Sequence, residues 1–229
     1  MLNFLVELLL TYLFVQGWII AFMLPFYLWY RYRHQEDNDP NHSFSNRLEK
    51  FFLSKQANYL VFFWALGEAL VWFVIPEFLL LLVVFMRIRR KKELLVYDVA
   101  GTVTGTVLAF IVSVPDRFIY SLPYIQERMI SLTHSWYDRL GVWGLLYQPF
   151  SGVPYKVFTL MAHQYHFFLP YFIVVAVLVR MSRYFVAYGL FAAIYPGLHR
   201  RVRSNYVWLF LIATFIFSAL LLKVYNSFA

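Results

Sequence analysis

Residues 57–92 read ANYLVFFWALGEALVWFVIPEFLLLLVVFMRIRRKK, and this stretch decides the fold. Ala57–Met86 is apolar for 30 residues, which is long for one membrane crossing of about 20 residues and short for two. Five Lys or Arg residues follow at 87–92, and the polar stretch 31–55 holds five more. Since basic residues concentrate in cytoplasmic loops, both flanks are predicted on the same side. The segment therefore predicts a re-entrant hairpin broken near its tip by Pro76.

The composition predicts an integral membrane protein. Of the 229 residues, 62% are hydrophobic and 14% are charged, whereas a soluble domain has about 25% charged residues. A disordered chain is excluded on the same grounds. The chain has no Cys, which excludes disulfides, thiolate metal sites and a cysteine nucleophile. The net charge of +8 favours contact with anionic lipids over nucleic-acid binding.

The second half of the chain repeats the layout of the first. Loop 115–140 has three basic and three acidic residues, which places it on the outer side. Gly141–Phe168 is then a second hairpin, entering from outside with Pro154 near its tip. Residues 73–77 align with 151–155 at an offset of 78. Opposed broken helices of this kind form inverted repeats in transporters.

The expected fold is an all-α membrane protein with about four transmembrane helices and two opposed re-entrant helical hairpins. The chain divides into an N-terminal helix and polar loop (1–56), a core of two hairpin-plus-helix repeats (57–198), and a basic loop with a last helix (199–229). The four spans are expected at Leu2–Tyr30, Leu94–Val114, Leu169–Ile194 and Tyr206–Leu222.

Two arginines stand in the middle of an apolar span. Arg180 and Arg183 are three residues apart, so they share a helix face. An arginine facing lipid there costs about 2.5–3.5 kcal/mol, so both are expected in a polar cavity. One interpretation is a clamp on a lipid phosphate. The other is a structural ion pair with Glu68 or Glu77.

Lys156 comes two residues after Pro154, in a helical first turn that attracts anions. It is predicted to bind the same phosphate, or else to anchor the hairpin at the membrane interface. The hairpin carboxylates Glu68 and Glu77 are candidate proton carriers.

Gly101 and Gly105 are predicted to let the following helix pack closely. No metal site is expected, because His163 and His166 lack a third ligand.

Four stretches together resemble one family of membrane proteins. They are 68–77 (EALVWFVIPE), 99–105 (VAGTVTG), 150–159 (FSGVPYKVFT) and 180–185 (RMSRYF). The segment 57–192 that contains them is similar to the DedA family, the SNARE-associated or VTT-domain superfamily, and within it to the YqaA-like branch. The resemblance implies paired re-entrant helices. It also implies movement of phospholipid or polyprenyl phosphate between leaflets, with ion coupling left open.

The expected function is therefore that of a flippase-like or scramblase-like lipid transporter in the bacterial inner membrane. Its expected partners are phosphate-bearing lipids, with proton or sodium coupling and a homo-oligomer left open, and with no cofactor and no nucleic acid. The chain lacks nucleotide-binding, zinc-protease and serine-hydrolase motifs, so it is not expected to be an enzyme. A non-transporting scaffold and an intramembrane enzyme acting on a lipid phosphate are the alternatives.

Overall fold

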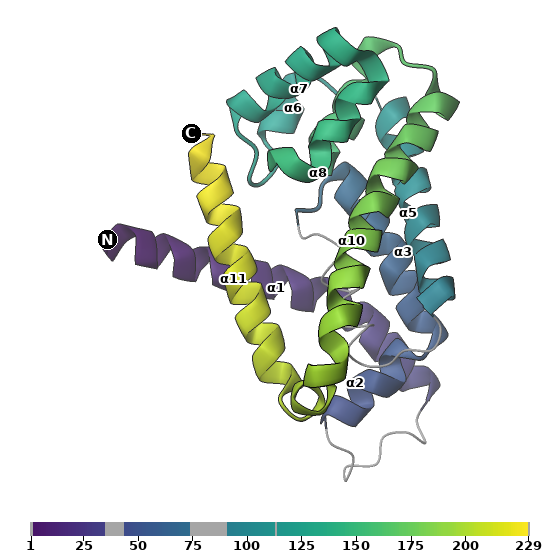
Figure 1. Ribbon diagram of the computed structural model, residues 1–229, viewed down its shortest axis with the longest axis vertical. Helices are drawn as coiled ribbons and strands as arrows, with labels where there is room; N and C mark the ends of the chain where they lie inside the picture. Colours follow the sequence, from purple (N-terminus) through teal and green to yellow (C-terminus); the bar gives the residue numbers. More distant parts are fainter. Residues whose placement is uncertain (1, 35–43, 74–90, 113, 229) are drawn as a thin grey trace.

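The computed structural model describes residues 2–34, 44–73, 91–112 and 114–228, and throughout these ranges the regular structure is helical (Figure 1). The α-helices are α1 (Leu2–Arg33), α2 (Phe44–Phe52), α3 (Lys55–Leu70), α5 (Lys91–Ile111), α6 (Asp116–Tyr120), α7 (Glu127–Leu140), α8 (Gln148–Ser151), α9 (Tyr155–Met161), α10 (Leu169–Ser204) and α11 (Tyr206–Ser227). Two 3-10 helices, η2 (Gly141–Tyr147) and η3 (Ala162–Tyr165), complete the set.

Four of these helices are long and apolar enough to cross a membrane, which confirms the four predicted spans. They are Phe4–Arg33 of α1, Glu93–Ile111 of α5, Leu169–Val186 of α10 and Val207–Ser227 of α11. Their outward side chains are apolar, as in Leu10 and Leu178, which are 61% and 60% exposed. The chain is thus a multi-pass membrane protein.

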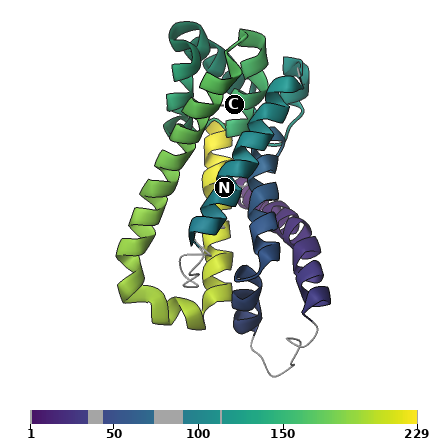
Figure 2. The same cartoon turned by 90° about the vertical axis from the view of Figure 1, so that its right-hand side faces the viewer.

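Helix α10 does not end near Ile194, where the predicted span ends, but continues to Ser204, through the start of the basic loop predicted from residue 199. The basic residues from 199 to 203 lie in its last turns, because Arg is a good helix former even where the chain has become polar. These turns bend aside beneath the bundle before α11 rises (Figure 2).

Helices α3 and α5 run parallel and pack closely. Gly101 lies against Phe62 and Ala65, and one turn later Gly105 lies against Leu66 and Ala69. A Cβ on Gly105 would stand 2.7 Å from the Leu66 carbonyl oxygen. This contact is too close for any residue with a Cβ atom, so the close packing requires glycine. The two helices therefore begin at the same end of the molecule.

Helices α1 and α10 run in the opposite direction to this pair. Phe172 of α10 contacts Phe110 of α5, and Tyr184 reaches back to Asp98, so α10 is antiparallel to α5. Ring contacts between Phe22 and Trp64 and between Trp29 and Tyr59 make α1 antiparallel to α3.

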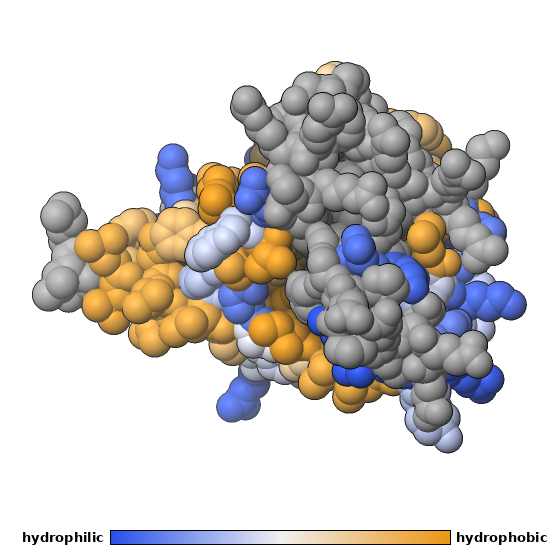
Figure 3. Space-filling view, turned by 90° about the horizontal axis from the view of Figure 1, so that it is seen from below, coloured by the Kyte–Doolittle hydropathy of each residue, from blue (hydrophilic) through white to orange (hydrophobic). Residues whose placement is uncertain are grey.

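One end of the molecule consequently gathers basic helix ends, and we call it the basic end. It holds the last turns of α1 and α10 and the first turns of α3 and α5, with Arg31, Arg33, Lys55, Lys91, Lys92, Arg200, Arg201 and Arg203. Figure 3 views the molecule from this end and shows the N-terminal part of α1 projecting as an apolar arm.

The segment from η2 to η3 packs against α10 and α5. Trp143 contacts Tyr171 near the start of α10, and Gln148 then reaches Arg183, more than three turns further along the helix. The chain turns at Gly152, whose φ of +75° suits glycine. Pro154 precedes α9, and His163 of η3 is hydrogen-bonded to Phe110, near the C-terminal end of α5.

Helix α7 covers the end opposite the basic end. The Tyr137 hydroxyl donates a 2.9 Å hydrogen bond to the Phe158 carbonyl of α9. Burial raises the pKa of Tyr137 well above its ordinary value, so this hydroxyl stays protonated as a donor. The bond fixes α9 beneath α7.

Candidate functional site

The centre of the bundle holds a buried ion-pair cluster contributed by three helices. Arg180 of α10 pairs with the Glu68 carboxylate of α3, and its Nε lies 3.7 Å from Asp98 Oδ2 of α5. The three residues are only 4–5% exposed. Because an unpaired charge at this depth is costly, each helix is held to the others through opposite charge.

Two tyrosines complete this central cluster, which we define as Glu68, Asp98, Tyr155, Arg180 and Tyr184. The Tyr184 hydroxyl donates a 2.7 Å hydrogen bond to Asp98 Oδ1 and accepts one of 3.4 Å from Arg180. The guanidinium carbon lies 5.5 Å from the centre of the Tyr155 ring, within range of a cation–π contact. The cluster is thus enclosed by aromatic and charged groups.

A line of threonines on α5 extends the polar interior beyond the central cluster. Thr102 and Thr106 follow Asp98 at intervals of four residues, so all three share one helix face, and both threonines are fully buried. Thr106 Oγ1 is hydrogen-bonded to the Tyr155 hydroxyl at 2.9 Å. Among the described residues, Thr102 Oγ1 has no hydrogen-bond partner, so this face of α5 carries a buried hydroxyl between Asp98 and Thr106.

Lys156 is fully buried and binds backbone carbonyls. Its ammonium donates to Val71 O at 3.1 Å and to Pro123 O at 3.0 Å. Val71 is the C-cap residue of α3, directly after Leu70, and the carbonyl end of a helix attracts cations. The sequence placed this lysine correctly in the first turn of the helix after Pro154, and its ammonium binds the end of α3. Its phosphate contact and its role as an interface anchor stay predictions.

Thr159 reinforces the same junction one turn further along α9. Its hydroxyl lies 2.6 Å from Ala69 O, near the end of α3. Helix α9 and the end of α3 come from the two halves of the chain, so these contacts join the halves directly beside the central cluster.

The two arginines predicted to act as a pair have separate partners. Arg180 lies in the central cluster, whereas Arg183 is partly buried and donates a 3.1 Å hydrogen bond to Gln148 of α8. The sequence allowed Arg180 either a lipid phosphate or an acidic side chain as its partner. The structure shows Arg180 in an ion pair with Glu68. Glu77 and Pro76 lie outside the described residues.

Asp98 and the two tyrosines were missed by the sequence reasoning. Asp98 is an acidic residue inside a membrane-length helix, and intramembrane carboxylates are rare enough to mark a site. That signal was present in the sequence. Tyr155 and Tyr184 carried no such signal, because they are two of 18 tyrosines.

Among the described residues, no three His, Cys, Asp or Glu side chains come together as metal ligands. His163, one of the two histidines considered, is hydrogen-bonded through Nδ1 to Phe110 O at 2.7 Å.

No family model, curated protein or solved structure matches this chain.

Proposed function

We propose that this protein is a membrane lipid transporter that moves a phosphate-bearing headgroup between leaflets, with the central cluster as its exchange site. The observation that carries the proposal is the pairing of Arg180 with Glu68 and Asp98 inside a membrane bundle. Intramembrane charges of this kind mark substrate and proton pathways in transporters. The DedA resemblance supplies the class of substrate, phospholipid or polyprenyl phosphate.

The directions of the helices and the contacts between the two halves support the opposed hairpins that such a carrier requires. Parallel α3 and α5 both begin at the basic end, so the last residue of α3 and the first residue of α5 lie at opposite ends of the bundle. The segment 141–165 packs against α10 and α5. Lys156 joins this segment to the end of α3 near the middle of the bundle, where sites lie in inverted-repeat transporters.

The charge balance of the cluster suggests how a headgroup is exchanged. Glu68 and Asp98 are balanced by Arg180 and the nearby Lys156, so the site is neutral when all four are ionised. A lipid phosphate adds one negative charge, and an uncompensated buried ion costs several kcal/mol. A proton taken up by Glu68 restores neutrality and frees the guanidinium to bind the phosphate. We therefore propose electroneutral exchange, one proton with each phosphate charge.

The route of that proton follows the polar face of α5. Asp98, Thr102 and Thr106 span about 12 Å, at the helical rise of 1.5 Å per residue. The buried Thr102 hydroxyl lies between Asp98 and Thr106, and the Thr106 hydroxyl is hydrogen-bonded to Tyr155.

The proposal is tested by flipping of labelled phospholipids and polyprenyl phosphate in liposomes that hold the purified protein. Wild type is compared with Glu68→Gln, which mimics the protonated carboxylate, and with Arg180→Lys, which keeps the charge but loses the bidentate geometry. Wild type should flip lipid with uptake of protons. Arg180→Lys should slow flipping strongly, and Glu68→Gln should remove its pH dependence.

The control is Arg183→Gln, since Arg183 lies outside the central cluster. Thermal unfolding of each variant shows that it is folded in the same detergent. If folded wild type flips none of these lipids, the transporter proposal is wrong and a scaffold role takes its place. Release of phosphate from the lipid would instead favour an intramembrane enzyme.

A further inference from the structure

A second cavity lies between α1, α2 and the start of α11, near the basic end and apart from the central cluster. Its volume is about 330 Å³, which is in the range of small-ligand pockets. At about 30 Å³ for each water-sized group, it accommodates on the order of ten methylene groups. A single extended acyl segment has this size.

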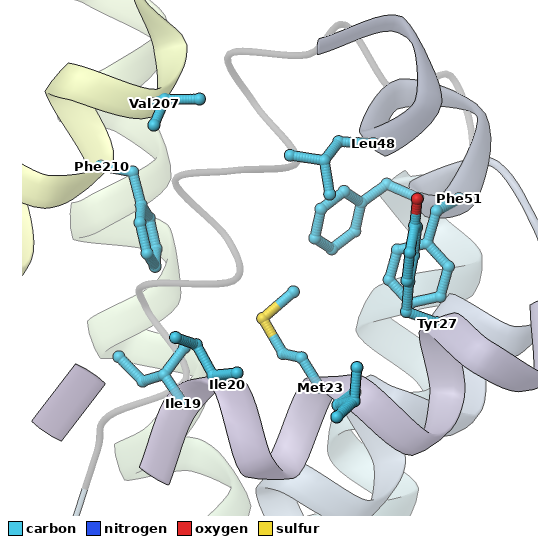
Figure 4. A pocket seen from close by; sticks show the side chains of 10 residues that line it. Ile19, Ile20, Met23, Tyr27, Leu48, Phe51, Val207 and Phe210 are labelled. Carbon is cyan, nitrogen blue, oxygen red and sulfur yellow. The ribbon is translucent and has the colours of Figure 1, made fainter. Parts of the chain in front are cut away.

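The lining of the cavity is almost entirely hydrocarbon. Figure 4 shows Ile19, Ile20 and Met23 of α1 facing Leu48 and Phe51 of α2, with α11 closing the third side. The α11 side chains are Val207 and Phe210. A lining without charged groups suits an alkyl chain and gives a phosphate or sugar nothing to bind.

Helix α2 explains why the cavity forms at the membrane surface. It is nine residues long and strongly amphipathic, with Leu48, Phe51 and Phe52 toward the cavity and Arg47 and Lys50 on the same short helix. A helix with this pattern lies along the interface, its apolar face turned to the acyl region. The cavity is thus at the depth where acyl chains begin.

The charges around the cavity complement an anionic headgroup. Helix α1 ends in Arg31 and Arg33 shortly after the cavity residue Tyr27, and the last turns of α10 carry three arginines shortly before Val207. In the last turns of α1 and α10 and in α2, the only acidic residue of the sequence is Glu49. Among the described residues, Arg47 Nε is buried without a hydrogen-bond partner.

We propose that this cavity binds one acyl chain of an anionic phospholipid of the cytoplasmic leaflet, whose headgroup is held by the basic end. This site shares no residue with the exchange site, so the proposal of a bound acyl chain does not depend on the proposal of lipid transport. Its occupant is a resident lipid that fixes α2 and α11 against α1.

The test is photolabelling of the purified protein in nanodiscs by phosphatidylglycerol that carries a diazirine on one acyl chain. Peptide mapping should find adducts on the cavity residues of α1 and α2. Met23→Trp fills the cavity and should lower this labelling about five-fold, a loss equivalent to about 1 kcal/mol. Leu10→Trp is the matched control on the lipid-facing side of α1, and its cavity labelling should equal that of wild type.

A phosphatidylcholine probe with the same tails separates chain binding from headgroup recognition without altering the fold. It should label the cavity several-fold less than phosphatidylglycerol, and Arg47→Gln should reduce that difference. Equal labelling at Leu10 and at Met23 would overturn the proposal, since it would indicate bulk lipid only. Crosslinks to a second protein chain in place of lipid adducts would also overturn it.

Discussion

The Lys156 ammonium donates a 3.1 Å hydrogen bond to the Val71 carbonyl, across 85 residues of sequence. The lysine is the second residue of α9 in the second half of the chain, and the carbonyl belongs to the residue that follows α3 in the first half. A buried cation thus satisfies the negative end of a helix, and it ties the two halves at the level of the central cluster.

Replacement of Lys156 should therefore destabilise the fold. Lys156→Met keeps the apolar stem but removes the donor that the Val71 and Pro123 carbonyls share, at a cost of about 1.5–3 kcal/mol for each hydrogen bond to a charged group. Loss of the buried charge offsets part of this cost, so we expect a net destabilisation of about 2 kcal/mol. Thermal unfolding in detergent measures it. Lys223→Met, on the exposed part of α11, is the control and should change the stability by less than about 0.5 kcal/mol.

Arg180 and Glu68 should show strong thermodynamic coupling. Arg180→Gln alone leaves two buried carboxylates without their cation, and removal of one partner of a buried pair costs about 3–5 kcal/mol. The double variant Glu68→Gln/Arg180→Gln should lose clearly less than the sum of the single variants. A double-mutant cycle of unfolding free energies measures the coupling. Additive losses would show that the pair contributes nothing specific.

The sequence was sufficient to predict the four spanning helices, because runs of apolar residues of membrane length have few other uses in a folded chain. It also identified Arg180 and Glu68 as buried charges, since charge inside an apolar run is costly wherever the chain places it. Their partners could not be predicted. Partner choice depends on how helices from distant segments align, and several pairings were equally compatible with the spacing.

Arg180 and Arg183 show that partners could not be predicted even for two residues of one helix. A spacing of three places both side chains on roughly one face. Their partners come from different elements, α3 and α5 for Arg180 and α8 for Arg183. Helix α8 is only four residues long, too short to be recognised by periodicity.

Gly105 should tolerate no side chain. In Gly105→Ala the new Cβ would stand 2.7 Å from the Leu66 carbonyl oxygen and 2.8 Å from the Ala69 Cβ, so α3 and α5 must separate. We expect a loss of about 1–3 kcal/mol, typical of overpacking. Gly17→Ala is the matched control, because nothing lies within 4 Å of the position that its new Cβ would take and alanine favours the helix by up to about 1 kcal/mol. Equal stability of the two variants would contradict the close packing.

The basic end should face the cytoplasm. The chain contains no cysteine, so in a single-cysteine variant the introduced residue is the one site that a maleimide labels. Asn46→Cys lies on α2 near the basic end and Ser131→Cys on α7 at the other end, and both positions are exposed. By the positive-inside rule, a membrane-impermeant maleimide should label Ser131→Cys in intact spheroplasts and Asn46→Cys only after permeabilisation. The reverse pattern would invert the proposed orientation.

Thr102→Val should separate proton movement from folding. The substitution keeps the shape of the side chain and removes a buried hydroxyl that has no hydrogen-bond partner among the described residues, so the stability should stay within about 0.5 kcal/mol of wild type or rise. If the α5 face carries the proton, flipping in liposomes should slow and its proton uptake should fall. Thr104→Val on the same helix, whose hydroxyl bonds to Ala100 O at an exposed position, should leave both unchanged. Normal proton uptake by Thr102→Val would place the proton route elsewhere and leave Thr102 a purely structural residue.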